Sequence, residues 1–454
     1  MPEATPAFTS LSESDLRPLE QAVRPSSREF ARRYPGDVPA RQPVHTVYGG
    51  AQLFKSDGTA RLGAIALRAL REYAPNARAL GDALGISGHA ALDTLYTRMV
   101  EKLEREPVED FRIDFEDGYG NRPDAEEDGH AMAVAEALAT GMKEGTLPPF
   151  VGIRIKPLND ELRARSVRTL DIVLSALWKR AGALPENFVI TVPKITVLEQ
   201  VDYAVGILQR LERKLGMPDG HLRFEVMVET PQIVFGADGT TPLARIPERA
   251  RGRLTAAHFG TYDYTAGVNI TAAHQRMRHP ACDFAKEMMQ VAFAGTGVWL
   301  SDGSTTVMPV PIHRSAPNGP ALTPRQVDEN RASVHHAWKL HFDDVTHSLV
   351  GGFYQGWDLH PAQLVTRYAA LYAFFLDGID AAGARLNNFV GKAAQATLIG
   401  DVFDDAATGQ GLLNFFLRGI NSGAITEQEA IRRTGLTAED VRGRSFTKIL
   451  KRQV

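Results

Sequence analysis

The stretch FVITVPKITVLEQVDYAVGILQRLERKLGMPDGHLRFEVMVETP, residues 188–231, decides the fold. It begins with an apolar run at Phe188–Val192, continues with an amphipathic segment, and returns to an apolar run at Arg223–Val228. Apolar residues at helical spacing line one face of the middle segment, which ends at Gly216 and Pro218 as helices do. Continuous apolar runs are typical of parallel strands buried on both faces. The stretch therefore predicts a strand, a covering helix and a second strand parallel to the first.

The same alternation recurs along most of the chain. The apolar runs that we interpret as strands are Val44–Tyr48, Phe111–Phe115, Phe150–Ile155, Phe188–Val192, Arg223–Val228, Thr255–Phe259, Val298–Ser301 and Gly352–Leu359. Eight strands with helices between most of them predict an α/β fold, a (β/α)8 TIM barrel. A doubly wound sheet is the alternative, but the chain lacks the G-x-G-x-x-G and G-x-x-x-x-G-K-[ST] phosphate turns that often accompany it.

Composition changes at both ends of the predicted barrel, which we place at residues 43–365. Residues 1–42 form an N-terminal arm rich in Pro, Ser and Arg, in which Ser12 and Asp15 resemble a capping box that opens a short helix ending near Pro25. Residues 366–454 are expected to form a helical C-terminal extension without further strands, in which Thr426 and Glu429 form a second capping box.

The composition of the 454 residues is that of a soluble globular protein, with 44% hydrophobic and 23% charged residues. A net charge of −3 argues against a dedicated nucleic-acid binder. The lone cysteine, Cys282, excludes an internal disulfide and fits a reducing compartment. The first ten residues do not resemble a signal peptide, and the longest apolar run, Ala369 to Leu376, is too short to span a bilayer. We therefore expect a cytoplasmic protein that partners neither nucleic acid nor membrane.

Polar residues follow the predicted strands with unusual density, at the end of a barrel where catalytic groups gather. They are Asp114, Glu116 and Asp117 at strand two, Arg154 and Lys156 at strand three, Lys194 after strand four, Glu229 after strand five, Gly260, Thr261 and Asp263 after strand six, and Asp358 and His360 at strand eight. A single Asp after a strand is more often a helix cap than a catalyst. Acids, an arginine and a lysine that all converge on one barrel mouth are harder to explain without a ligand.

These residue types suit one kind of chemistry. Glu229 and Asp263 can hold a hard divalent cation, Mg²⁺ or Mn²⁺, which leaves water and substrate oxygens to complete an octahedron. The metal would act as a Lewis acid on a 2-oxo acid or its enolate. Arg154 can bind a carboxylate or carbonyl oxygen, and the backbone after Gly260 can approach a ligand closely. Together they indicate formation or cleavage of a carbon–carbon bond beside a carbonyl.

At these residues the chain resembles the citrate lyase beta-subunit and malyl-CoA lyase family, an aldolase group of the phosphoenolpyruvate/pyruvate barrels that also include malate synthase. Six short motifs carry the resemblance in the family's order. They are Asp114–Asp117 (D-F-E-D), Arg154–Lys156 (R-I-K), Val192–Lys194 (V-P-K), Val228–Pro231 (V-E-T-P), Gly260–Asp263 (G-T-Y-D) and Gly352–Gln363 (G-F-Y-Q-G-W-D-L-H-P-A-Q).

The resemblance implies a metal-dependent carbon–carbon lyase or aldolase that acts on a small oxo or hydroxy acid, either free or as a CoA thioester. It makes Glu229 and Asp263 the metal ligands and Arg154 the clamp on the substrate carbonyl. Glu116, Asp117 and Lys194 complete the predicted catalytic set. We assign Asp114, Gly260, Thr261 and His360 to substrate binding, although a structural role at the end of strand eight is favoured for His360 over that of a base. The arm and the tail suggest a homo-oligomer.

Departures from the family pattern leave alternatives open. Tyr262-Asp-Tyr264 is closer to malate synthase, which condenses an acyl-CoA with a 2-oxo acid. Asp117-Gly replaces the histidine that simple aldolases use as a base, so Asp401, Asp404 and Asp405 become candidates, although helix caps are the favoured interpretation for them. A catalytically silent barrel that binds metal and keto acid is a third possibility.

Overall fold

A computed structural model of the protein describes residues 10–36, 40–315, 319–391, 397–399, 402–404, 406–443 and 449. Eight parallel strands form one sheet in the order β7-β6-β5-β4-β3-β2-β1-β8. They are β1 (His45–Gly50), β2 (Asp110–Asp114), β3 (Phe150–Arg154), β4 (Phe188–Val192), β5 (Phe224–Val228), β6 (Leu254–Phe259), β7 (Trp299–Ser301) and β8 (Gly356–Asp358). Each strand lies within or beside a run that the sequence predicts.

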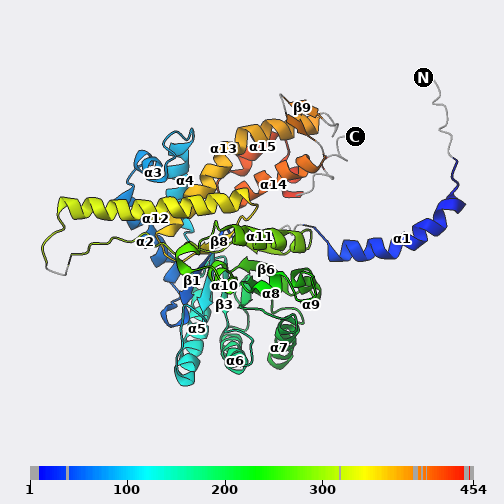
Figure 1. The fold of residues 1–454 in the computed structure, drawn as a ribbon, viewed down its shortest axis with the longest axis horizontal. Coiled ribbons are helices and arrows are strands. Elements are labelled where there is room, and N and C mark those ends of the chain that lie inside the picture. Colours follow the sequence, from blue (N-terminus) through cyan, green and yellow to red (C-terminus); the bar gives the residue numbers. More distant parts are fainter. Residues whose placement is uncertain are drawn as a thin grey trace.

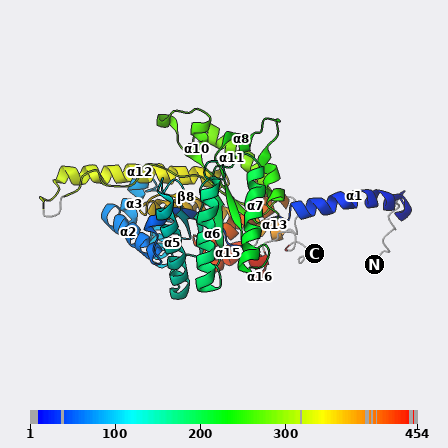
Figure 2. The same cartoon turned by 90° about the horizontal axis from the view of Figure 1, so that it is seen from below.

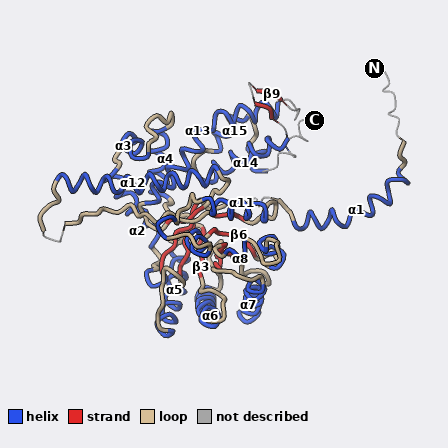
Figure 3. The backbone as a smooth tube through the Cα atoms, viewed as in Figure 1, coloured by secondary structure: helices blue, strands red, loops and turns tan. Residues whose placement is uncertain are grey.

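The sheet closes on itself almost completely. β1 pairs with β2 on one side and with β8 on the other. The segment after β7 completes the ring, because Ser304 forms a parallel bridge to Trp357 and the Trp357 N–H donates to the Gly303 carbonyl at 3.0 Å. Figure 3 shows the strands together at the centre with helices around them. The predicted (β/α)8 TIM barrel is confirmed.

Helices connect and surround the strands (Figure 1). From β1 to β8 they are η1 (Ala51–Leu53), α2 (Gly58–Tyr73), α3 (Ala77–Leu84), α4 (Leu92–Arg105), α5 (Asp124–Glu144), α6 (Arg163–Ala181), α7 (Glu199–Leu215), α8 (Pro231–Val234), η2 (Pro242–Arg245), α9 (Ile246–Arg249), α10 (Thr261–Gly267), η3 (Ala272–His274), α11 (Pro280–Phe293) and α12 (Pro324–Val350). The predicted apolar stripe of α7 is buried, and the helix ends at Gly216 in the left-handed conformation that glycine adopts easily.

The helices between β1 and β2 belong to a second layer. α2, α3 and α4 pack against α12 and the long helix α13 (Gln363–Gly391), which also contacts α14 (Ala406–Ser422) and α15 (Glu427–Thr434). In Figure 1 α3, α4, α12 and α13 lie above the barrel. α13 begins shortly after β8 and runs through residues 365–366, where the sequence analysis places the boundary between the barrel and the C-terminal extension. That domain boundary stays a prediction.

The N-terminal helix is longer than the sequence predicts. The capping box of Ser12 and Asp15 is confirmed, but α1 (Glu13–Arg33) continues through Pro18 and Pro25, so the expected end near Pro25 is wrong. A proline inside a helix removes one backbone hydrogen bond and disfavours the turn before it. Here the residues after Pro25 resume the helix, with Glu29 and Arg32 paired at 2.6 Å. None of its residues is buried, and Figure 2 shows α1 projecting away from the barrel.

The C-terminal part is mainly helical, as predicted, and ends with α15 and α16 (Ala438–Gly443). The capping box of Thr426 and Glu429 is confirmed. The expectation of no further strands is wrong, because β9 (Thr397–Ile399) and β10 (Val402–Asp404) pair antiparallel. Three-residue strands are too short to produce an alternating sequence pattern. No helix among the described residues is long and apolar enough to cross a membrane.

Candidate active site

The structure brings most of the predicted site residues together at the mouth formed by the carboxyl ends of the strands. They surround a cavity of about 330 Å³. Its lining residues are Tyr48, Asp114, Asp117, Gly118, Arg154, Glu229, Gly260, Thr261, Tyr262, Asp263, Ser304, Trp357 and Leu359. Glu116 and Lys194 lie directly beside this set, since Lys194 contacts both Asp117 and Asp263.

Arg154, the last residue of β3, is held by Asp114, the last residue of the neighbouring strand β2. Its Nε donates to Asp114 Oδ1 at 2.7 Å and its Nη2 to Oδ2 at 2.5 Å, the two-pronged geometry that fits a guanidinium to a carboxylate. Asp114 also accepts the backbone N–H groups of Glu116 and Gly118. The structure therefore gives Asp114 the task of positioning Arg154 and the loop after β2.

The free end of the guanidinium points into an acidic and aromatic environment. Arg154 Nη1 lies 3.1 Å from Glu116 Oε2, and the guanidinium carbon lies 4.8 Å from the centre of the Tyr48 ring. Burial opposes the charge, but Asp114 and Glu116 outweigh it and hold the pKa of Arg154 well above its usual value. Arg154 is therefore a permanent, almost fully buried cation that lines the cavity, with Nη1 between Glu116 and the Met227 sulfur, to which it donates at 3.7 Å.

Lys194 occupies the centre of the acidic residues. Its backbone has a positive φ of 50°, and its N–H donates to Glu229 Oε1 at 2.6 Å. Its ammonium lies 2.5 Å from Glu116, 3.1 Å from Asp117 and 3.5 Å from Asp263 Oδ2. Burial lowers the pKa of Lys194, but these carboxylates raise it above its ordinary value. Lys194 thus partly neutralises the acids that the sequence places after β2 and β6.

Glu229 follows β5 and is almost completely buried, whereas the Asp263 side chain, in the first turn of α10, is 43% exposed. Burial and the nearby charge of Asp263 raise the pKa of Glu229 to about 8. Gly260 makes room for this arrangement, because a Cβ there would lie 2.4 Å from Glu229 Oε2. The mouth therefore holds a carboxyl group that lacks sufficient positive charge from the protein.

This donor set fits a hard divalent cation. The ligands offered are carboxylate oxygens, which Mg²⁺ and Mn²⁺ prefer, and a cation beside Glu229 would relieve the repulsion that raises its pKa. Within the described part of the chain no three His, Cys, Asp or Glu side chains gather as a metal cage. Glu229 and Asp263 would be two ligands of a site that water and substrate complete, and this assignment stays a prediction.

The structure separates two residues that the sequence assigns to substrate binding, Thr261 and His360. Thr261 Oγ1 is buried at the cavity and has no hydrogen-bond partner among the described residues, so it offers a donor or acceptor to a ligand. His360 does not line the cavity. Its Nδ1 accepts the Ala362 N–H at 3.1 Å and its backbone N–H donates to Gln363, which is the arrangement of a helix cap. Asp401 and Asp405 lie outside the described residues, and only the backbone of Asp404 is described, in β10.

Sequence reasoning missed the aromatic walls of the cavity. The rings of Tyr48 and Trp357 lie 4.6 Å apart, and Tyr262 donates its hydroxyl to the Ser304 carbonyl at 2.9 Å. Both Tyr48 and Trp357 stand inside strands, where an aromatic residue is ordinarily a core residue. Their position near the carboxyl ends of β1 and β8 is the signal that could have found them.

Fold and site together define the class of the protein, a (β/α)8 barrel whose mouth combines a buried arginine with several carboxylates. Residues 23–449 match the model of the family described as Domain of unknown function (DUF6986), and the chain belongs to that family. No curated protein matches the sequence significantly.

Three solved structures illustrate what the fold is similar to. A citrate lyase from Burkholderia xenovorans LB400 superposes with a TM-score of 0.55 and 19% identity, over 87% of this chain and 97% of that one. A malate synthase from Haloferax volcanii gives a TM-score of 0.48 and 14% identity, over 89% of this chain and 97% of that one. An HpcH/HpaI aldolase/citrate lyase family protein from Burkholderia cenocepacia J2315 gives 0.35 and 15%, over 61% and 84%. At these identities the similarity to the citrate lyase establishes the fold, and the reaction is a separate question.

Proposed function

We propose that the protein is a Mg²⁺- or Mn²⁺-dependent carbon–carbon lyase or aldolase that cleaves or forms a bond beside the carbonyl of a small oxo or hydroxy acid. One observation carries this proposal. A single cavity contains both the Arg154 guanidinium and the Glu229–Asp263 pair, so one substrate could contact the clamp and the metal ligands together.

Each side chain has a separate task in this proposal. Glu229 and Asp263 hold the cation, which supplies Lewis-acid chemistry at a carbonyl oxygen when bound. Arg154 donates to a substrate oxygen through Nη1, which would exchange its weak contact with the Met227 sulfur for that oxygen, since Nε and Nη2 donate to Asp114. Such a fixed guanidinium offsets negative charge that develops on that oxygen. Lys194 holds Glu116 and Asp117 in place.

Calorimetry tests the substrate class. With Mg²⁺ present, we titrate pyruvate, oxaloacetate and glyoxylate into the protein, and we repeat each titration without metal. We expect at least one oxo acid to bind only with metal, and Arg154→Lys to weaken that binding. Arg223→Lys is the matched control, since Arg223 is exposed before β5 and away from the mouth. Absence of binding for all three acids, with acetyl-CoA also present, contradicts the proposal.

Tyr262-Asp-Tyr264 favours a second candidate, the condensation of an acyl-CoA with a 2-oxo acid, as in malate synthase. A thiol assay separates the two reactions. Release of free CoA from acetyl-CoA and glyoxylate identifies condensation, whereas cleavage of a hydroxy acid or its CoA thioester without net thiol release identifies a lyase. Metal and oxo-acid binding without turnover of either kind would identify a silent barrel.

The proposal includes a cytoplasmic homo-oligomer. Cys282 is buried, and burial raises the pKa of its thiol to about 12, so it is suited neither to a disulfide nor to nucleophilic chemistry.

α1 exposes Leu16, Leu19, Val23 and Phe30, and an unpacked helix with an apolar stripe is marginal in water. Light scattering should find more than one chain per particle, and Leu19→Glu with Val23→Glu should reduce that number. A monomer in the unmodified protein contradicts this part.

A further inference from the structure

The interior of the barrel is unusually polar below the mouth. Barrels are ordinarily filled by layers of branched apolar side chains. Here Arg112 of β2 pairs with Asp110 at 2.7 Å and with Glu225 of β5 at 3.0 Å, while His258 of β6 contacts Glu225 at 3.0 Å and accepts the Trp357 indole N–H. Gly152 leaves space for the guanidinium, since a Cβ there would lie 2.3 Å from Arg112 Nη1.

A cavity of about 480 Å³ opens at the amino ends of the strands, opposite the mouth, and reaches this network. Asp110, Arg112 and Glu225 line its deep end, and Phe150, Phe188 and Trp299 are among its walls. Phe150 and Trp299 meet edge to face with ring centres 6.1 Å apart. We name this space the lower cavity. Its shape, with aromatic walls and a few buried polar groups, is that of a small-molecule site.

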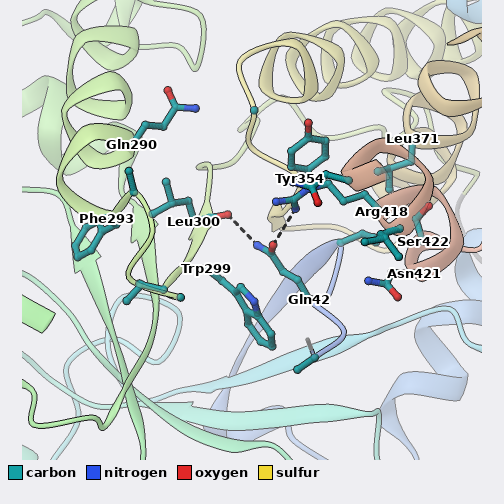
Figure 4. Close-up of a pocket in the computed structure, with 18 of the residues that line it drawn as sticks. Gln42, Gln290, Phe293, Trp299, Leu300, Tyr354, Leu371, Arg418, Asn421 and Ser422 are labelled. Atoms are coloured by element: carbon teal, nitrogen blue, oxygen red, sulfur yellow. Dashed lines mark hydrogen bonds between the residues drawn. The ribbon is translucent and has the colours of Figure 1, made fainter. Parts of the chain in front are cut away.

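A second hollow adjoins the lower cavity and differs from it in chemistry. Figure 4 shows this space, of about 240 Å³, between the barrel and α14, with Trp299 beside it and the side chains of Gln42 and Arg418 meeting within it. Gln42 donates to the Leu300 carbonyl at 3.0 Å and accepts from Arg418 at 3.3 Å. The two central polar side chains of this hollow thus contact each other, whereas the lower cavity contains a polar atom without a partner among the described residues.

Asp110 carries the unsatisfied acceptor of this network, beside the buried Nε and Nη1 of Arg112, which also have no hydrogen-bond partner among the described residues although Nε lies 3.0 Å from Glu225 Oε1. It is 2% exposed, and its Oδ2 accepts from Thr46 at 2.8 Å and from Arg112 at 2.7 Å. Its Oδ1 is buried and has no hydrogen-bond partner among the described residues. Burial and the charge of Glu225 raise the pKa of Asp110 although Arg112 opposes them. A buried carboxylate oxygen without a donor is costly, so a donor at this position would stabilise the structure.

We propose that the lower cavity is a binding site for a small organic cation, whose N–H group donates to Asp110 Oδ1 and whose apolar part lies between Phe150, Phe188 and Trp299. The charges that line the cavity favour a cation, because the acids Asp110, Glu225 and Glu186 outnumber the arginines Arg112 and Arg223. Aromatic faces attract cations as well as apolar groups. A flat amidinium with an aromatic ring combines both features.

Three molecules of nearly equal shape test whether the lower cavity prefers a positively charged ligand. They are benzamidine, benzamide and benzoate. Isothermal calorimetry, with Mg²⁺ present to compete at the mouth, should show saturable binding of benzamidine, at least tenfold weaker binding of benzamide, and no binding of benzoate. Equal affinity for benzamidine and benzamide, or absence of benzamidine binding, overturns the proposal and leaves a cavity that holds only water.

Variants locate the site. Asp110→Asn should weaken benzamidine at least tenfold and leave benzamide unchanged, whereas Asp263→Asn at the mouth should leave both unchanged. Loss of benzamidine binding in Asp263→Asn but not in Asp110→Asn would assign the ligand to the mouth and refute the proposal. Because Asp110 belongs to a buried network, Leu254→Trp at the half-buried rim provides a second block that leaves the ion pairs intact. This variant should also lose benzamidine, and retention would contradict the site.

Discussion

Glu225 and Glu229 lie four residues apart along β5 and its extension, both almost fully buried, yet their acidities differ greatly. Burial raises the pKa of both. At Glu225 the charge of Arg112 and the hydrogen bonds from His258 and Thr191 outweigh burial and lower the pKa to about 2. At Glu229 the neighbouring Asp263 adds to burial, and the pKa is raised to about 8.

The difference separates a structural carboxylate from one that awaits a ligand. Glu225 receives Arg112, His258 and the Thr191 hydroxyl from the protein itself. Glu229 receives a backbone N–H from Lys194, but Lys194 directs its ammonium toward Glu116, Asp117 and Asp263. The protein thus completes the charge balance inside the barrel and leaves it incomplete at the mouth.

The largest effect expected from this comparison is on stability. Glu225→Ala leaves Arg112 and His258 buried without their carboxylate, which should cost about 3–5 kcal/mol in free energy of unfolding. Glu229→Gln removes a group whose ionisation is unfavourable in the fold, so the metal-free variant should be at least as stable as the parent at pH 8. Urea unfolding without metal measures both values. If both variants lost the same free energy of unfolding, Glu225 and Glu229 would not differ in the way described.

The effect expected on catalysis, from a substitution of Arg154, is almost as large. Arg154→Lys keeps the charge but cannot bind Asp114 through two parallel bonds and still present a third donor to the substrate. If the proposed reaction is correct, turnover should fall about 10²–10³-fold, the size found for loss of one preorganised donor. Lys156→Arg is a control of the same kind, since Lys156 bonds to the Phe115 carbonyl and Glu127 rather than to the cavity. Equal losses in both variants would argue against the clamp.

The two glutamates also predict opposite slopes of stability against pH. Glu225 has a folded pKa below the unfolded value of about 4.3, so its contribution, about 3 kcal/mol, is complete above pH 4.3 and is lost as the pH falls toward 2. Glu229 has a raised folded pKa, so its contribution is present below about pH 4.3 and is lost as the pH rises toward 8.

Urea unfolding of the parent, Glu225→Gln and Glu229→Gln across pH 2–9 isolates each slope by difference. The difference between the parent and Glu225→Gln should change below about pH 4.3, and that between the parent and Glu229→Gln above it. Mg²⁺ should abolish the second slope only. A flat difference for Glu229→Gln without metal would show that its carboxyl titrates normally.

The smallest expected effect concerns packing at the mouth. Gly260→Ala places a methyl group 2.4 Å from Glu229 Oε2, so the carboxylate must move. Overpacking of this kind costs about 1–3 kcal/mol. Metal affinity should fall together with stability, whereas Gly129→Ala on α5, where a Cβ meets nothing within 4 Å, should leave metal affinity unchanged. Unchanged metal affinity in Gly260→Ala would mean that the Glu229 carboxylate can move away from the new methyl group and still bind the metal.

The sequence predicts the barrel well because buried parallel strands such as Phe188–Val192 are continuous apolar runs, and the helices between them have a regular stripe. It predicts the mouth because strand order fixes where Arg154, Glu229 and Asp263 converge. It fails where local signals conflict with the longer context, as at Pro25, or where an element is as short as β9.

The polar interior was missed for a different reason. Asp110, Arg112 and Asp114 alternate with apolar residues along β2, which is the pattern of a strand with one charged face. In a barrel the inner face is expected to be apolar, so the alternation suggests an exposed face unless the partners on β5 and β6 are known. Glu225 and His258 lie more than a hundred residues away in the sequence, and only the closed sheet brings them to Arg112.

We propose above that Glu229 and Asp263 form a metal site, which the protein leaves short of positive charge. Calorimetric titration of Mg²⁺ into metal-free protein at pH 7, in buffers of different ionisation enthalpy, tests it most directly. We predict one ion per chain, release of a proton on binding, and loss of both signals in Glu229→Gln. Binding of equal affinity in Glu229→Gln, or binding without proton release, would contradict the account.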